Sequence, residues 1–177
     1  MTERSLRHAA AQLLELCRER RLKIATAESC TGGLVAAALT EIAGSSDVVD
    51  CGFVTYSNAA KQSMLGVPIA TLRRHGAVSA ATAAAMAAGA LNNSQADLTV
   101  SITGIAGPGG GSKQKPVGLV YFAAASRDGK RLARKRQYGN IGRRRVRQRS
   151  VDEAFELLRR LAQGARDRGV IKTQGPT

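Results

Sequence analysis

The stretch Ala25-Thr26-Ala27-Glu28-Ser29-Cys30-Thr31-Gly32-Gly33 constrains the fold more than any other part of the chain. A β-prone run over residues 22–27 leads into it, and an alanine-rich apolar run over residues 34–43 leads out of it. This order predicts a strand, a tight turn of small residues and the start of a helix. Such a turn directs free backbone N–H groups and the positive end of the helix dipole towards one point. The sequence therefore predicts a strand–helix unit with a place for an anion.

This turn is compatible with catalysis, with phosphate binding or with a purely structural role. A serine hydroxyl there could attack a carbonyl group while neighbouring N–H groups stabilise the oxyanion, and the same groups could hold a phosphate. From spacing alone, Ser29 is expected to be an N-cap, because serine in front of a helix usually caps it. Glu28 is then expected to be a solvated turn residue, and Gly32 and Gly33 to let helix and sheet pack closely.

The rest of the chain alternates helical and β-type patterns. Helices are expected over residues 3–20, 59–65, 69–75, 80–91 and 146–161, and strands over 48–56, 98–103, 117–125 and 132–138. Helices mixed with parallel-type and hairpin strands predict an α/β fold, a three-layer α/β/α sandwich with a mixed sheet. The 177 residues are expected to form one domain over 1–168 with a flexible tail over 169–177.

Composition narrows the classes of protein and of site. No apolar run approaches the ~18 residues of a membrane span, and residues 1–21 lack an apolar signal-peptide core, so a cytoplasmic protein without a membrane partner is expected. Cys17, Cys30 and Cys51 lack CxxC spacing, which favours reduced thiols over disulfides or zinc. Cys30 is a rival nucleophile, although a buried filler role is favoured. No cluster has metal-ligand spacing, so neither a metal nor a cofactor is expected.

Positive charge is concentrated in one segment. The net charge is +14, and residues 127–149 contain eleven Lys or Arg against the single acidic residue Asp128. Such a segment attracts nucleic acid, nucleotide phosphate or acidic lipid, unless it is simply a solvated face. The chain has no Trp, three Tyr and three Phe, so stacking platforms for single-stranded nucleic acid are scarce. Nucleic-acid binding is therefore the less favoured interpretation.

Candidate partners for the serine follow the second expected strand. If a helix begins near Ser57, Lys61 lies about one turn along it and faces back towards Tyr56. A desolvated lysine loses its proton more easily and can then take a proton from a serine, and a neighbouring tyrosine hydroxyl could relay it. Considered separately, an exposed Lys61 and a Tyr56 at the edge of the core explain these residues more simply.

A glycine loop, Gly104-Ile105-Ala106-Gly107-Pro108-Gly109-Gly110-Gly111-Ser112, follows the third expected strand. It does not match G-x-x-x-x-G-K-[ST], so it is not a P-loop. On composition alone it is a flexible surface loop.

Five motifs in one order resemble the CinA C-terminal domain family. They are residues 26–33, residues 52–58 with Lys61, residues 76–79, residues 104–108 and residues 115–118, and the resemblance runs from about Leu6 to Leu161. It implies an α/β/α fold and commonly a homodimer. Stand-alone members are nicotinamide-nucleotide amidohydrolases, so the resemblance also implies hydrolysis of nicotinamide mononucleotide to nicotinate mononucleotide and ammonia, which recycles NAD.

The resemblance assigns roles residue by residue. Ser29 matches the nucleophile, Lys61 and Tyr56 match its activating partners, and the loop from Gly104 to Gly111 would shape the nucleotide pocket. An arginine would suit the substrate phosphate through paired hydrogen bonds. The substrate-binding residues implied are Cys30, Thr31, Gly32, Gly33, Thr103, Gly104, Ala106, Gly107, Arg143 and Arg147, with Ser112 as a further donor.

The chain departs from the family pattern at two positions. Gly109 and Gly142 each stand where the family often has an Asp. Two other functions stay open. A non-catalytic nucleotide- or DNA-binding protein is favoured by residues 127–149 and by the association of CinA with competence and DNA uptake. A structural dimer module is favoured by the alanine-rich helix over 80–91.

Overall fold

The computed structural model describes residues 3–165, so the tail expected over 169–177 lies outside the described residues. The elements in chain order are α1 (Glu3–Glu19), β1 (Ile24–Glu28), α2 (Leu34–Thr40), a short 3₁₀ turn (Ser45–Asp47), β2 (Val49–Val54), α3 (Asn58–Leu65), α4 (Ile69–His75), α5 (Ala80–Asn92), β3 (Leu98–Gly104), β4 (Leu119–Ser126), β5 (Arg131–Gln137) and α6 (Arg143–Gly164).

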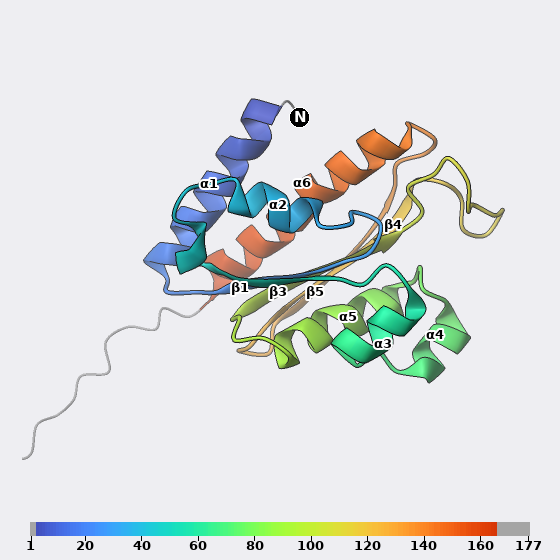
Figure 1. Cartoon of the computed structure of the whole chain (residues 1–177), viewed down its shortest axis with the longest axis horizontal. Coiled ribbons are helices and arrows are strands. Elements are labelled where there is room, and N and C mark those ends of the chain that lie inside the picture. Colours follow the sequence, from blue (N-terminus) through green and yellow to red (C-terminus); the bar gives the residue numbers. More distant parts are fainter. Residues whose placement is uncertain (1–2, 166–177) are drawn as a thin grey trace, which may run out of the picture.

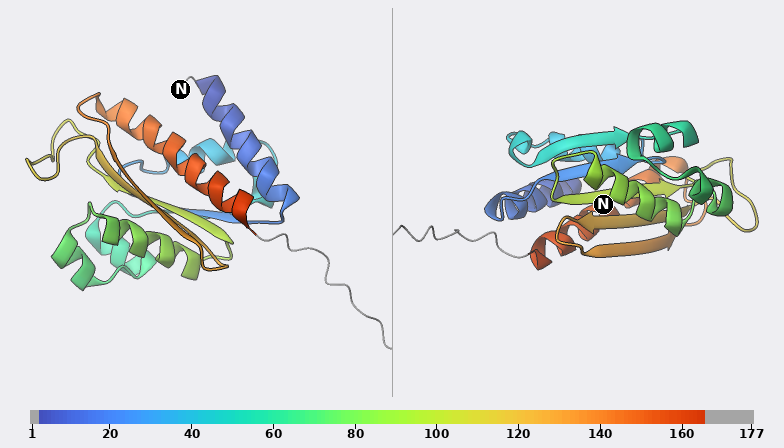
Figure 2. Two further views of the ribbon diagram at one scale, coloured as in Figure 1. Left: turned by 180° about the vertical axis from the view of Figure 1, so that it is seen from behind. Right: turned by 90° about the horizontal axis from the view of Figure 1, so that it is seen from below.

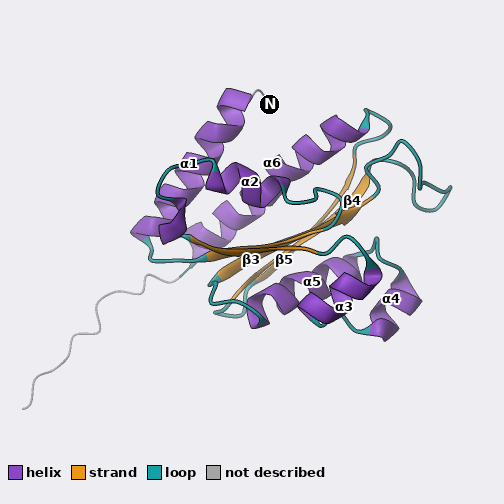
Figure 3. Cartoon of the chain, viewed as in Figure 1, coloured by secondary structure: helices purple, strands orange, loops and turns teal. Residues whose placement is uncertain are grey.

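One mixed sheet divides the molecule into three layers. The strand order is β2-β1-β3-β4-β5. β1 pairs in parallel with β2 and β3, while β3–β4 and β4–β5 are antiparallel. Helices α1, α2 and α6 cover one face, and α3, α4 and α5 cover the other (Figures 1 and 3). The α/β/α sandwich expected from the sequence is confirmed.

The two central parallel strands are buried because helices cover both of their faces. All five residues of β1 are buried, as are all residues of β3 except Gly104. α1 and α6 pack against each other on one face (Figure 2). On the other face, the small alanines of α5 let it lie close to β3: the Ser101 hydroxyl donates to the Ala83 carbonyl at 2.6 Å. The alanine-rich helix therefore packs closely onto the sheet, and seven of its thirteen residues are buried.

Several element boundaries differ from the sequence expectation by a few residues, and two of these differences bear on the site. α6 begins at Arg143 rather than at residue 146. Residues 143–145 are exposed, so they contribute no apolar periodicity from which the start of the helix could be recognised. β1 continues through Glu28, which brings that carboxylate into the sheet.

Parallel strands place their carboxyl ends at the same edge of a sheet, where ligands usually bind in open α/β folds. Ser29 follows β1, Thr55 follows β2 and Gly104 ends β3. The amino-terminal end of α6 reaches this edge as well, because the Arg143 guanidinium donates to the Gly107 carbonyl at 3.1 Å. Within residues 3–165, no helix is long and apolar enough to cross a bilayer.

Candidate active site

Glu28 organises the turn that follows β1. The residue is fully buried. Its carboxylate accepts hydrogen bonds from the N–H groups of Gly33, Val35 and Ala36 at 3.0, 3.1 and 2.9 Å. It also accepts one from the Thr26 hydroxyl at 3.3 Å. The expectation of a solvated turn residue is wrong, because this carboxylate satisfies N–H groups at the start of α2.

Ser29 is consequently not the cap of α2. Gly33 occupies the N-cap position without a side-chain hydrogen bond, so the N-cap interpretation of Ser29 is wrong. Gly32 and Gly33 have φ angles of 59° and 94°, a left-handed conformation that glycine adopts without strain. The two glycines turn the chain sharply and leave the Ser29 side chain free of the helix.

Lys61, which α3 carries, contacts Ser29. Its Nζ lies 3.0 Å from Ser29 Oγ and donates to the Thr55 carbonyl at 2.8 Å. α3 begins as expected, because the Ser57 side chain caps it by accepting from the Ala60 N–H at 3.0 Å. The sequence therefore located the helix that places this amine beside the serine.

The environment of Lys61 favours the neutral amine. Only 1% of the residue is exposed, so the expectation of a solvated helical lysine is wrong. Burial lowers its pKa below the ordinary value of 10.5. Among residues 3–165, Lys61 forms no salt bridge with a carboxylate. A neutral amine at this distance can accept the Ser29 hydroxyl proton.

Part of the turn remains available to an incoming oxyanion. The Gly32 N–H donates to the Ser29 carbonyl at 3.1 Å, and the Gly33 N–H donates to Glu28. In the described chain, neither the Cys30 nor the Thr31 N–H donates to a backbone or carboxylate oxygen. These two groups are therefore the candidate oxyanion donors.

Cys30 is a poor nucleophile in this setting. The residue is 6% exposed, and burial raises the pKa of its thiol to about 12. Because the thiolate is the reactive form, Cys30 is inert at neutral pH. The three cysteines are free thiols, and the residues that the structure describes contain no cluster suited to a metal ion.

Tyr56 is exposed and is hydrogen-bonded to an arginine of α6. The residue is 61% exposed, and its hydroxyl accepts a hydrogen bond from Arg143 Nη2 at 2.8 Å. Within the described residues no hydrogen bond joins Tyr56 to Lys61 or Ser29. The structure thus brings Ser29 and Lys61 together and joins Tyr56 to Arg143 instead.

Two arginines of α6 hold the loops around the serine. Arg143 links Tyr56 to the Gly107 carbonyl. Arg147, one helical turn later, donates to the Thr31 carbonyl from Nη2 at 2.7 Å and from Nε at 3.3 Å. Residues four apart share a helix face, so both guanidinium groups lie towards the same edge of the sheet.

Other residues expected to bind substrate are engaged within the protein. The Thr103 hydroxyl donates to the Ala77 carbonyl at 2.7 Å, and the Ser112 hydroxyl accepts from the Lys115 N–H at 3.0 Å. Ala106 is buried. At Gly104, an added Cβ would lie 2.7 Å from the Leu119 carbonyl oxygen. The Thr103 hydroxyl is therefore already engaged as a donor, whereas Ser112, which is exposed, only accepts in these contacts.

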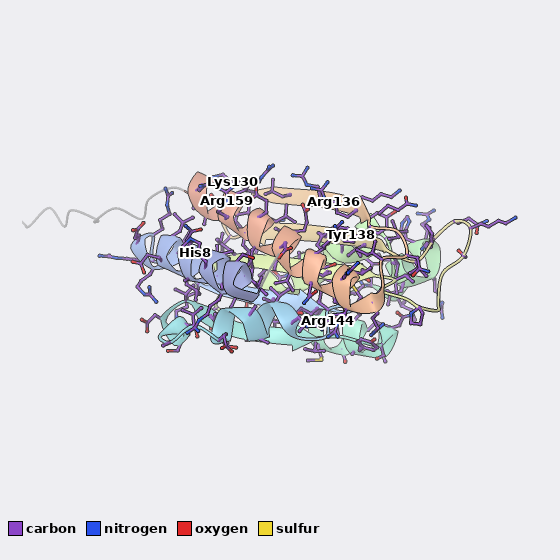
Figure 4. All side chains as sticks on the ribbon, turned by 90° about the horizontal axis from the view of Figure 1, so that it is seen from above. His8, Lys130, Arg136, Tyr138, Arg144 and Arg159 are labelled. Carbon is purple, nitrogen blue, oxygen red and sulfur yellow. The ribbon has the colours of Figure 1, made fainter. Side chains whose placement is uncertain are left out.

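The basic segment is partly neutralised. Glu153 lies 2.6 Å from Arg136 and 3.3 Å from Arg134, which ties β5 to α6. Figure 4, which looks onto the layer of α1, α2 and α6, shows Arg136 and Arg144 on this side of the molecule with His8 on α1. This part of the charge has a structural role.

Comparisons with known proteins identify related sequences and structures. The model of the CinA C-terminal domain family matches residues 6–162. The nicotinamide-nucleotide amidohydrolase PncC of Escherichia coli K12 is 46% identical over 158 residues, which cover 89% of this chain and 95% of that protein. The solved structure of the competence/damage inducible protein CihA from Agrobacterium tumefaciens has a TM-score of 0.87 and 53% identity, covering 88% of this chain and 94% of that one.

Several relatives are much longer than this chain. A putative competence-damage inducible protein from Caldicellulosiruptor bescii is 49% identical over 154 residues, which cover 84% of this chain and 37% of that protein. The chain spans about a third of the length of this and two further curated relatives.

Proposed function

Because the chain belongs to the CinA C-terminal domain family, we propose that it is an amidohydrolase that converts nicotinamide mononucleotide to nicotinate mononucleotide and ammonia. The observation that carries the proposal is the contact of 3.0 Å between Ser29 Oγ and the buried Nζ of Lys61. Relatives named nicotinamide-nucleotide amidohydrolase PncC support the substrate, since this chain covers 95% of the Escherichia coli protein.

In the proposed reaction, Ser29 Oγ attacks the carboxamide carbon while Lys61 accepts the hydroxyl proton. The N–H groups of Cys30 and Thr31 stabilise the oxyanion. Lys61 then protonates the departing nitrogen, so ammonia leaves and an ester to Ser29 remains. A water molecule gives a proton to Lys61 and attacks this ester. Lys61 returns the proton to Ser29 Oγ as the carboxylate product leaves.

The arginines of α6 are proposed to recognise the nucleotide. Arg143 is exposed, and among residues 3–165 its hydrogen-bond acceptors are neutral: the Tyr56 hydroxyl and the Gly107 carbonyl. A phosphate dianion is a stronger acceptor than either, so it can recruit this guanidinium. Tyr56 then acts at the substrate entrance, and its matched role as an activating partner of Ser29 stays a prediction. So do a homodimer and a cytoplasmic location.

The test is ammonia release from nicotinamide, its riboside, its mononucleotide and NAD. We expect the mononucleotide to be the preferred substrate and Ser29→Ala and Lys61→Ala to release no ammonia from it while remaining folded. Ser63→Ala is a matched control, because Ser63 is an exposed residue of α3. Unchanged turnover in Ser29→Ala would exclude the serine mechanism.

A further inference from the structure

Glu28 is a buried carboxylate directly before the proposed nucleophile, and it has no part in the proton transfers described above. Four hydrogen bonds of 2.9 to 3.3 Å converge on its two oxygens. Three of the donors are backbone N–H groups, and hydrogen bonds to a carboxylate are stronger than those to a neutral acceptor. The N–H groups at the start of α2 are thus satisfied by the protein's own Glu28 carboxylate rather than by a bound anion.

This arrangement fixes both ends of the nucleophile turn. On one side, Glu28 belongs to β1, and its own carbonyl accepts from the Thr55 N–H at 2.8 Å. On the other side, its carboxylate holds the N–H groups of Gly33, Val35 and Ala36. Only residues 29–32 lie between these two anchors. The carboxylate therefore sets the distance between the end of β1 and the start of α2.

The same hydrogen bonds determine which N–H groups a substrate can use. The Gly33 N–H already has a charged acceptor and is not available to a second anion. The Cys30 and Thr31 N–H groups are left, and Arg147 holds the intervening turn through the Thr31 carbonyl.

We propose that Glu28 is a positioning residue, whose carboxylate holds the turn so that Ser29 Oγ faces Lys61 while the Cys30 and Thr31 N–H groups face the oxyanion. This inference rests on the proposed function. It predicts that removing the charge misplaces the nucleophile without disturbing the binding of the nucleotide. A role limited to helix capping predicts loss of stability alone.

The experiment measures the reactivity of Ser29 without a nucleotide. Phenylmethanesulfonyl fluoride forms a bond between Ser29 Oγ and sulfur while the S–F bond breaks, and the hydroxyl proton leaves with fluoride. Intact-mass spectrometry gives the labelling rate, with Ser29→Ala as the blank. We expect Glu28→Gln to be labelled about 100-fold more slowly than the wild type, the cost of an active-site misplacement of ~1 Å. With nicotinamide mononucleotide, kcat should fall similarly while KM changes little.

Asp97→Asn is the matched control. Asp97 is a buried carboxylate, 8% exposed, that precedes β3 at the opposite end of the sheet and accepts from the Lys23 N–H at 2.9 Å. Its amide variant should lose stability but keep the wild-type labelling rate. Folded Glu28→Gln with the wild-type labelling rate would overturn the inference, as would an equal loss in Asp97→Asn.

A second variant covers the case in which Glu28→Gln does not fold. Thr26→Val removes one donor from the carboxylate with little change in volume, and we expect labelling to slow about threefold. An unchanged rate in Thr26→Val would then contradict the inference. A wild-type chain that is labelled at Ser29 but releases no ammonia would contradict the proposed function only. One that is not labelled at all would contradict both proposals.

Discussion

Gly89 of α5 offers a test of how the position of Lys61 is set. It is distant from Ser29 and Lys61 in the sequence, but it packs against α3, the helix that carries Lys61. A Cβ added at Gly89 would lie 1.9 Å from the carbonyl oxygen of Leu65, the last residue of α3. Such contacts are not found below 3.0 Å. In Gly89→Ala, α3 and α5 must therefore separate by at least about 1 Å.

That separation acts directly on the serine–lysine contact. Lys61 is one helical turn before Leu65, and its Nζ lies 3.0 Å from Ser29 Oγ. A shift of α3 by about 1 Å that carries Lys61 away from Ser29 takes the Nζ–Oγ distance beyond the range of a hydrogen bond. We expect kcat to fall about 100-fold, which corresponds to about 2.7 kcal/mol in the activation free energy.

The stability of the same variant provides a second measurement. Alanine gains about 1 kcal/mol over glycine in a helix, while overpacking costs about 1–3 kcal/mol. We therefore expect the free energy of unfolding to fall by up to about 2 kcal/mol. Ammonia release and denaturant unfolding measure the two effects. Gly164→Ala is the control, because a Cβ there meets only Lys130 Nζ at 3.5 Å. Wild-type kcat in folded Gly89→Ala would refute the reasoning.

Three further predictions concern the site itself. Burial lowers the pKa of Lys61, so kcat/KM should rise with pH through a pKa below 10.5, and Lys61→Arg should be inactive. Between the folded-state pKa and 10.5 the unfolded chain binds more protons than the folded chain, so the free energy of unfolding should also rise with pH. Lys61→Met should lack this slope. Burial raises the pKa of the Cys30 thiol to about 12, so iodoacetamide at pH 8 should not alkylate it, and mass spectrometry should show no added mass at Cys30. Cys30→Ala should retain most of the wild-type turnover. Tyr56→Phe should raise KM for the mononucleotide with little change in kcat, whereas a large loss of kcat would restore Tyr56 as a proton relay.

The sequence predicted those parts of the site that depend on local pattern. The strand, turn and helix around Ser29 follow from residues that are adjacent in the chain. The position of Lys61 follows from a helix whose cap, Ser57, is four residues away. The fold class followed in the same way, from the alternation of helical and β-type segments.

Contacts between distant segments were not predictable in this way. The hydrogen bond between Arg143 and Tyr56 joins residues that are 87 positions apart, so no local pattern indicated it. Glu28 was misjudged because side-chain caps are sought next to the first helical residue, whereas this carboxylate comes six residues before Leu34. Its complete burial results from the packing of β1 between β2 and β3.

The order of the elements along the chain has a consequence during synthesis. The serine and the amine are both encoded before residue 62, yet Arg143 and Arg147, which hold the loops around them, belong to the final helix. Segments leave the ribosome in order from the amino terminus. A nascent chain would therefore carry Ser29 and Lys61 for most of translation without the contacts of α6, and the loops around them would be held only after that helix had emerged.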